Sequence, residues 1–346
     1  MKDYICILGR DPKLSVLELA SYCKRKNIAY HLKEHNSRLA VISLSSPLNI
    51  EELGGTVKIA EQTTMDHLIP DSSKINFAIT TIDSKDILPA LKGLWKSNKI
   101  KAMQRYTNVH DIPPSKSKNL DIEIIVYKNV IYKVISLSNP KKYKERDEAR
   151  PSFDPKKVIS IRLAKILINL SEAKTEVLDP FCGNGTILQE ASLMGLQAIG
   201  IDISTRDAKK NLEWLGKKAK LTQGDAAKII PTLNKIETIV TEPYLGPYFK
   251  KLPSEQQAQA TIKELEVLYK SLFTVLSNKV TGKIVIIVPQ IRTYKRTFSL
   301  NIAPMLEKAG FISYSSIKEI KTPIFYEKRK SKVERFIYIL EQKRKP

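Results

Sequence analysis

The segment VLDPFCGNGT, from Val177 to Thr186, decides the fold expected for this chain. An apolar run ends in Asp179, a proline follows, and a loop of small residues closes on Gly183 and Gly185. This order is typical of a strand that leads through a tight loop into a helix, and ligands of α/β sheets bind beyond the carboxyl ends of such strands. Glycines let the backbone approach a ligand closely, and a helix N-terminus offers unpaired N–H groups. The segment therefore predicts a ligand site at the mouth of a parallel sheet.

The spacing of this loop argues against two common nucleotide-binding loops. A dinucleotide fingerprint needs a third glycine three residues after Gly185, where Leu188 stands, and a phosphate-cradling loop needs a lysine that is absent here. Asp179 would also repel a polyanion, but it suits a ligand with a cationic or donor group. A nicotinamide-dependent dehydrogenase is therefore a distant alternative. Cys182 is interpreted as a small filler of the turn.

Two more carboxylates follow the next two expected strands. Asp202 ends the run IGID, and Asp225 ends the run QGD. The second acid of such a unit is positioned to accept the hydroxyls of a ribose, and the third can accept the exocyclic amine of an adenine. With Asp179 near a cationic end, the three acids fit S-adenosylmethionine as the cofactor. One strand-end acid alone is as often a helix cap, but three in register with the glycine loop favour a pocket.

The size and composition of the chain exclude several classes of protein. Its 346 residues suffice for two or three domains. No apolar run reaches roughly 18 residues, and the start MKDYICILGRD lacks the features of a secretion signal. Three scattered cysteines and four histidines give neither a disulfide framework nor a metal-ligand spacing. We expect a soluble, cytoplasmic protein with no membrane contact and no metal.

The charge of the chain is strongly positive. The formal net charge of +22 indicates a polyanionic partner such as nucleic acid. The excess is concentrated between Lys92 and Lys118, where Trp95, Tyr106 and His110 supply flat rings that can stack on bases. The candidate RNA-binding residues are Lys92, Lys96, Lys99, Lys101, Arg105, Lys116 and Lys118. The alternative interpretation is a basic helix face followed by a solvated loop.

The first 138 residues read as two small α+β modules. Residues 1–60 carry a strand, a helix opened by a capping box from Ser15 to Glu18, two more strands and a short helix near Asn49–Leu53. Residues 61–138 carry a strand, a helix and a hairpin with the sequence DIEIIVY-KN-VIYKVISL. Both modules are too short for a doubly wound sheet.

The rest of the chain reads as a linker and an α/β domain. Residues 139–155 are polar, charged and bracketed by prolines, as expected of a linker. Residues 156–346 alternate apolar strands with amphipathic helices, which predicts a mostly parallel, Rossmann-like sheet covered on both faces. The runs FISYSSIKEI and RFIYIL can form an antiparallel pair at the edge of this sheet.

The run VLDPFCGNGTI, followed by IGIDIS and GDA, resembles the class I adenosylmethionine-dependent methyltransferases. The preceding run RDEARPSFDPKKVISIRLAKILINLS is similar to RNA amino-methyltransferases with an N-terminal THUMP module, the type that methylates the guanine N2 amine at position 10 of tRNA. The order of parts agrees, with a ferredoxin-like unit, a THUMP-like RNA-binding domain and a Rossmann-like domain. The resemblance implies cofactor contacts at Asp179, Pro180, Phe181, Gly183, Gly185, Thr186, Asp202, Ile203, Asp225 and Ala226.

The expected reactive loop departs from the pattern of this family. Its members carry Asp-Pro-Pro-Tyr or a close variant after the fourth strand, whereas this chain has Glu242, Pro243 and Tyr244. The guanine amine is a poor nucleophile because its lone pair is delocalised into the ring, so an enzyme must hold acceptors on its N–H groups. A carboxylate and a proline carbonyl supply acceptors, and an aromatic ring holds the base. Glu242, Pro243 and Tyr244 are therefore the expected catalytic residues.

The leading hypothesis is thus a tRNA guanine-N2 methyltransferase whose N-terminal half docks the tRNA, with or without a small accessory subunit. Five linker residues could continue the basic track: Lys141, Lys142, Lys144, Arg146 and Arg150. One alternative is methylation of another amine, adenine N6 or cytosine N4, in RNA or DNA, although a THUMP-like module argues against DNA. A second alternative is an RNA-binding protein that keeps the nucleoside pocket without turnover, because its reactive loop has drifted.

Overall fold

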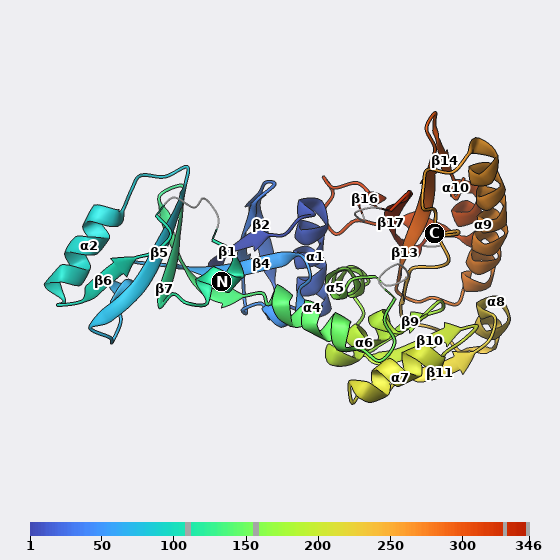
Figure 1. Cartoon of the computed structure of the whole chain (residues 1–346), viewed down its shortest axis with the longest axis horizontal. Coiled ribbons are helices and arrows are strands. Elements are labelled where there is room, and N and C mark those ends of the chain that lie inside the picture. The colour runs from blue at the N-terminus through green and yellow to red at the C-terminus, as the bar shows by residue number, and fades with distance from the viewer. Residues whose placement is uncertain (108–111, 155–158, 328–330, 344–346) are drawn as a thin grey trace. The chain divides into compact units, whose positions relative to one another are not determined.

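The computed structural model describes residues 1–107, 112–154, 159–327 and 331–343. The chain forms two compact units (Figure 1). Unit 1 comprises Met1–Val16 and Asn27–Lys142, and unit 2 comprises Leu17–Lys26 and Tyr143–Pro346. His110, one of the rings proposed for stacking, lies outside the described residues.

Unit 1 is built on one sheet, whose eight described strands lie in the order β2-β3-β1-β4-β8-β7-β5-β6. The strands are β1 (Lys2–Leu8), β2 (Tyr30–His35), β3 (Leu39–Leu44), β4 (Thr56–Thr63), β5 (Lys74–Ile82), β6 (Lys101–Gln104), β7 (Ile122–Tyr127) and β8 (Val130–Leu137). The helices are α1 (Pro12–Arg25), which continues into unit 2, α2 (Leu88–Ser97) and α3 (Pro114–Ser117), with short 3₁₀ turns at Ile50–Glu52 and Asp66–Leu68. Strand β4 pairs with β1 on one side and β8 on the other, so both expected modules share this sheet. The division at residue 60 stays a prediction, and that position falls inside β4.

Most elements expected in unit 1 are present. The hairpin of β7 and β8 turns at Lys128 and Asn129, which both have a positive φ, as a tight two-residue hairpin turn requires. The capping box from Ser15 to Glu18 is wrong. Helix α1 already begins at Pro12, and the Ser15 N–H donates to the carbonyl of Asp11, so Ser15 lies inside the first turn. Proline is favoured at such a start because its missing N–H would have no partner there.

Unit 2 contains the expected α/β sheet. Its strands are β9 (Glu176–Asp179), β10 (Gln197–Asp202), β11 (Lys220–Gln223), β12 (Ile239–Thr241), β13 (Lys283–Arg292), β14 (Thr297–Ser299), β15 (Phe311–Ser313), β16 (Ile324–Tyr326) and β17 (Val333–Gln342). The order is β11-β10-β9-β12-β13-β17-β15, with β14 paired to β13 and β16 to β17. The five strands from β11 to β13 are parallel, and β17 is antiparallel to both β13 and β15. The mostly parallel sheet and the antiparallel end are therefore confirmed.

Helices cover both faces of this sheet, as the alternating pattern predicted. The helices within unit 2 are α5 (Ile161–Leu170), α6 (Thr186–Leu193), α7 (Arg206–Trp214), α8 (Ala226–Ile229), α9 (Glu255–Leu276) and α10 (Ala303–Ala309), with a 3₁₀ turn at Ile230–Thr232. Helix α4 (Pro140–Ala149) begins in unit 1 and continues into unit 2. Figure 1 shows α9 on one side of β13 and α5 and α6 on the other. Buried side chains of α9, among them Leu265, Tyr269 and Phe273, pack with those of β12 and β13 in one core cluster. This core holds the carboxyl ends of β9 to β13 at one edge.

The segment expected to be a linker is largely helical. Helix α4 occupies Pro140–Ala149, and Tyr143 on it is buried. The Lys165 ammonium lies 4.1 Å from the centre of the Tyr143 ring, and Lys144 pairs with Glu148 one turn later. This helix was not predicted from the sequence; it forms because charged residues at helical spacing support one another and one aromatic residue anchors the helix. The interpretation of residues 139–155 as a linker stays a prediction.

Candidate active site

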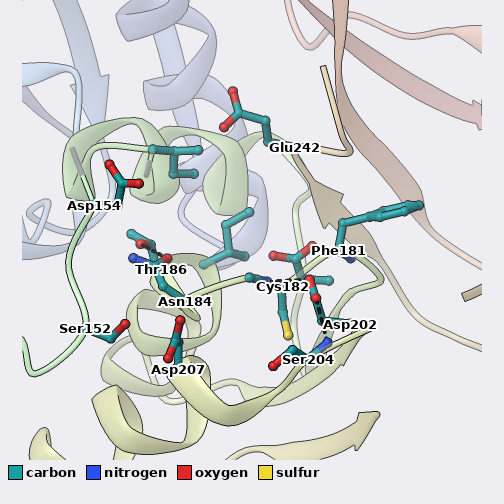
Figure 2. Close-up of a pocket in the computed structure, with 14 residues that line it drawn as sticks. Ser152, Asp154, Phe181, Cys182, Asn184, Thr186, Asp202, Ser204, Asp207 and Glu242 are labelled. Carbon is teal, nitrogen blue, oxygen red and sulfur yellow. Dashed lines mark hydrogen bonds between the residues drawn. The ribbon is translucent and has the colours of Figure 1, made fainter. Parts of the chain in front are cut away.

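A pocket of about 430 Å³ opens at the carboxyl edge of the unit 2 sheet. Six of the residues singled out from the sequence line it: Asp179, Phe181, Gly183, Thr186, Asp202 and Glu242. They come from the ends of β9, β10 and β12, from the loop before α6 and from the first residue of that helix. In Figure 2, Glu242 lies at one end of the drawn set, and Asp207 and Ser204 lie at the other. The expected reactive loop and the expected cofactor loop therefore share one cavity.

Asp179 is the most buried acid of the pocket, with 2% of its surface exposed. Its Oδ1 accepts hydrogen bonds from the Thr241 hydroxyl at 2.7 Å and from the Phe181 N–H at 3.1 Å. Burial raises the pKa of Asp179 to about 7; these two hydrogen bonds oppose the rise, and the charges of Asp202 and Glu242 add to it. A positively charged ligand would favour the ionised carboxylate, so the site is suited to a cation.

The glycine loop holds the second acid in place. Gly183 has a φ of 50°, and its N–H donates to Asp202 Oδ2 at 2.8 Å. The Ser204 N–H donates to Asp202 Oδ1 at 3.1 Å. Gly185 caps helix α6 with a φ of 79°, and a Cβ there would lie 3.1 Å from the Ala208 Cβ. Glycine is therefore required at position 185 both for backbone conformation and for packing against α7.

Several pocket residues escaped the sequence analysis. Asn184, between the two glycines, has a buried Nδ2 without a hydrogen-bond partner among the residues that the structure describes. The loop sequence itself could have indicated this donor. Ser152, Asp154 and Asp207 also line the pocket. No local signal marks them, because they reach the cavity from the segment after α4 and from α7.

Arg150 supports the glycine loop instead of extending the basic surface. Its side chain is fully buried, its Nη1 donates to the Thr186 hydroxyl at 2.8 Å, and it pairs with Asp147. Thr186 in turn donates to Asn184 Oδ1 at 3.1 Å. Arg150 as a surface contact to RNA is therefore wrong, because its guanidinium is enclosed between α4 and the start of α6. Arg146 of the same helix pairs with the buried Glu190 of α6.

Glu242 is fixed by an arginine from a distant strand. Arg335 of β17 donates from Nε to Glu242 Oε1 at 2.8 Å, and the exposed fractions of these side chains are 8% and 11%. The Arg335 Nη1 also donates to the Ser331 hydroxyl at 3.1 Å and to the Val333 carbonyl at 3.3 Å. These bonds orient the guanidinium, so Arg335 both balances the charge of Glu242 and sets the direction of its carboxylate.

The residues after Glu242 form a tight loop that leads to α9. Pro243 is buried, while Tyr244 is 53% exposed and is not among the pocket-lining residues. Gly246 has a φ of 100°, and a Cβ there would lie 2.8 Å from Thr261 Cγ2. The loop thus presents the Tyr244 ring to solvent while its backbone is held against α9. The catalytic role of these residues stays a prediction.

Five predicted cofactor contacts do not line the cavity: Pro180, Gly185, Ile203, Asp225 and Ala226. Asp225 is exposed and caps helix α8, where its Oδ1 accepts the Ala227 N–H at 2.9 Å. Capping explains this acid without a ligand, and its contact to a base stays a prediction.

The residues of unit 1 that were predicted to bind RNA carry their side chains at the surface. All seven lysine and arginine side chains predicted to bind RNA are exposed. The prediction that Trp95 stacks on bases is wrong, because its side chain is buried. Trp95 is 1% exposed, its Nε1 donates to the Leu68 carbonyl at 2.9 Å, and its ring packs edge-on against Phe77. Trp95 lies one helical turn after the buried Leu91, on the face of α2 that packs into the core. Tyr106 is partly exposed, and the Lys116 ammonium lies 5.3 Å from the centre of its ring.

Two further observations concern metals and membranes. Within residues 1–107, 112–154, 159–327 and 331–343, no cluster of three or more histidine, cysteine, aspartate or glutamate side chains could hold a metal ion. None of the helices in the described part of the chain has the length and apolar character needed to cross a bilayer.

Comparison with known families finds models that match parts of the chain. Residues 149–313 match the family model described as "RMKL-like, methyltransferase domain". A second model, described as "DNA methylase", matches residues 82–211, a range that stops before Glu242.

Curated relatives match parts of the chain. A "tRNA (guanine(10)-N2)-dimethyltransferase" of Pyrococcus abyssi is 31% identical over 207 residues, 58% of this chain and 55% of that protein. A protein of the same name from Methanothermobacter thermautotrophicus is 38% identical over 106 residues, 29% of this chain and 31% of that protein. The chain thus spans about half the length, or less, of these two relatives. Among solved structures, TrmN from Thermus thermophilus aligns with 98% of this chain and 99% of its own, at 14% identity and a TM-score of 0.49.

Proposed function

We infer that this chain, whose residues 149–313 match the model of an RMKL-like methyltransferase domain, transfers a methyl group from S-adenosylmethionine to the exocyclic N2 amine of a guanosine in tRNA. The observation that carries the proposal is the single cavity shared by Asp179, Asp202 and Glu242. The relatives named tRNA (guanine(10)-N2)-dimethyltransferase support tRNA as the substrate and position 10 as the target.

The hydrogen-bond donors and acceptors that line the pocket match the polar groups of S-adenosylmethionine. The Asn184 Nδ2, which has no hydrogen-bond partner in the described part of the chain, offers a donor to the ligand's carboxylate, and Asp179 and Asp202 offer acceptors to its cationic end and its ribose hydroxyls. When bound, this cofactor supplies an electrophilic methyl group on a sulfonium sulfur. Asp225 is proposed to contact the adenine from the rim.

The chain's own residues would act on the amine. The Glu242 carboxylate accepts a hydrogen bond from an N–H of the amine, which orients the nitrogen and stabilises the positive charge that develops on it. Arg335 holds Glu242 in place for this role. The Pro243 carbonyl accepts a second N–H, and the exposed Tyr244 ring stacks on the guanine. The glutamate is longer than the aspartate of the family pattern, and the Arg335 ion pair restricts the additional side-chain freedom.

Unit 1 is proposed to dock the tRNA. The seven exposed lysine and arginine side chains predicted between Lys92 and Lys118 would contact phosphates, so binding should weaken steeply as salt is added. The division into a ferredoxin-like unit and a THUMP-like domain is part of this proposal, as is a cytoplasmic location, where tRNA is available. A small accessory subunit is compatible with it.

Methylation of adenine N6 or cytosine N4 is the second candidate, and the match of residues 82–211 to a DNA methylase family favours it. Because that match does not include the reactive loop, it concerns the cofactor side of the site more than the choice of amine.

The test is incubation of the chain with labelled S-adenosylmethionine and unmodified tRNA transcripts, followed by nucleoside analysis. N2-methylguanosine or its dimethylated form supports the proposal, and methyladenosine or methylcytidine replaces it with the second candidate. Cofactor binding without transfer indicates an RNA-binding protein that has lost turnover. The variant Glu242→Ala should abolish transfer, whereas Glu213→Ala, an exposed acid of α7, should leave it unchanged.

A further inference from the structure

Two segments that carry exposed side chains leave the unit 2 sheet at the same edge as the pocket. One is the loop after β12, residues 242–254, and the other is the turn between β13 and β14, residues 292–297. Thr241 of β12 is in register with Ile286 of β13, and the two strands are parallel. Strand β13 continues six residues further, to Arg292. At about 3.3 Å per residue, the turn stands roughly 20 Å beyond the end of β12, and Figure 1 shows the hairpin of β13 and β14 projecting beside α9.

Both segments combine exposed aromatic rings with exposed cations. The exposed fractions of Tyr294, Tyr248 and Tyr244 are 83%, 62% and 53%. The exposed basic side chains are Lys250, Lys251, Arg292, Lys295 and Arg296. The acid within the two segments is Glu242, which lies in the pocket and pairs with Arg335. Aromatic rings interleaved with cations are the means by which proteins hold single-stranded nucleic acid.

The turn that carries Tyr294 is held in one conformation. The hydroxyl of Thr293, a residue 5% exposed, accepts the N–H groups of Lys295 and Arg296 at 3.3 and 3.2 Å, and it donates to the Arg296 carbonyl at 2.8 Å. Arg296 also pairs with Glu255 at 3.0 Å, which ties the turn to the first residue of α9, next to the loop after β12. Tyr294 is thus presented to solvent by a fixed backbone, so little order would have to be gained on binding.

We propose that residues 292–297, together with Tyr248, Lys250 and Lys251, bind the RNA strand next to the target guanosine. Tyr294 stacks on a base of that strand, while Arg292 and Lys295 contact its phosphates. This surface extends the pocket, so the inference rests on the proposed function and adds to it a second RNA contact, separate from the basic segment of unit 1.

The size of the effect follows from one base–aromatic stack, which corresponds to a change in affinity of about 5-fold to 100-fold. The variant Tyr294→Ala should weaken the binding of a tRNA transcript by a factor in this range, measured by fluorescence anisotropy on the full chain. Tyr294→Phe keeps the ring and should bind as the unmodified chain does. Lys295→Ala should make the affinity less dependent on salt. Each phosphate contact contributes close to one unit to the slope of log K against log [salt], and this variant removes one such contact. The matched control is Trp214→Ala, which removes an exposed ring of α7 on the same unit.

Each outcome separates this inference from the proposed function. If the unmodified chain methylates tRNA but Tyr294→Ala retains its affinity and its kcat/KM, the inference is wrong and the proposed function stands. If the chain methylates no RNA but Tyr294→Ala still loses affinity, the surface binds RNA and the proposed function is wrong. If Tyr294→Phe and Tyr294→Ala lost RNA affinity equally, the proposal that the Tyr294 ring stacks on a base would be wrong. S-adenosylmethionine binding, followed by calorimetry, should be the same in all variants, because Tyr294 does not line the pocket.

Discussion

Asp179→Asn should stabilise unit 2 at neutral and alkaline pH, although it removes an acid assigned to cofactor binding. Burial raises the pKa of Asp179 from 3.8 to about 7. At 1.36 kcal/mol per pH unit, this rise corresponds to about 4 kcal/mol of unfavourable free energy once the carboxyl is ionised. Asparagine keeps an Oδ1 that can accept from Thr241 and Phe181, so the hydrogen bonds at that atom are retained.

The sign of the pH dependence follows from the protons bound. Between pH 4 and pH 7 the folded chain retains the Asp179 proton while the unfolded chain has released it, so this residue lowers the free energy of unfolding as pH rises. Below pH 4 both states are protonated, and the cost vanishes. The stability difference between Asp179→Asn and the unmodified chain should therefore grow from pH 4 to pH 7 and remain constant above.

The measurement is equilibrium urea unfolding at pH 5, 6, 7 and 8. The emission of Trp214 in unit 2 is isolated by subtracting the signal of a Trp214→Phe variant. Asp225→Asn, at an exposed helix cap that asparagine can also form, is the matched control and should change the free energy of unfolding by less than about 0.5 kcal/mol. A gain from Asp179→Asn of the same size at pH 5 and pH 8 would refute the assignment of a raised pKa to this carboxyl.

Three further substitutions test the packing around the two units. Arg335→Ala leaves the Glu242 carboxylate enclosed without its partner, so urea unfolding of unit 2 should show a loss of about 3–5 kcal/mol, and Arg335→Lys should recover part of both stability and methyl transfer. Gly200→Ala brings a Cβ to 2.5 Å from Leu188 Cδ1 of α6. This overpacking should lower the free energy of unfolding by about 1–3 kcal/mol in the same assay. An unchanged unfolding midpoint would mean that Leu188 and α6 shift to accommodate the methyl group without cost. Trp95→Phe removes a buried indole hydrogen bond and part of the core of unit 1, and hydrogen exchange in β5 and β7 should report a loss of about 2 kcal/mol, whereas unchanged protection there would contradict its place in the core.

The alternation of apolar strands and amphipathic helices in the sequence was sufficient to predict the mostly parallel α/β sheet of unit 2. The positions of Asp179 and Asp202 at the ends of two expected strands also predicted that they share one pocket, because parallel strands end at the same edge of a sheet. Glu242 was expected from the resemblance to amino-methyltransferases, whose reactive loop follows the fourth strand, and it lies directly after β12. The helix in the supposed linker was missed because its stability depends on Tyr143 packing and not on apolar periodicity.

Sequence alone thus determined that the ends of β9 and β10 and the glycine loop meet at one pocket, since local spacing sets secondary structure and parallel order sets the edge at which side chains meet. Tertiary structure alone decided which partners control those side chains. Arg335 reaches Glu242 from 93 residues away, and Arg150 reaches Thr186 from 36 residues away. Trp95 shows the same limit, because an aromatic residue in a basic segment reads alike whether it faces solvent or the core. Burial and long-range pairing depend on how the elements pack, and no local pattern of residues records that packing.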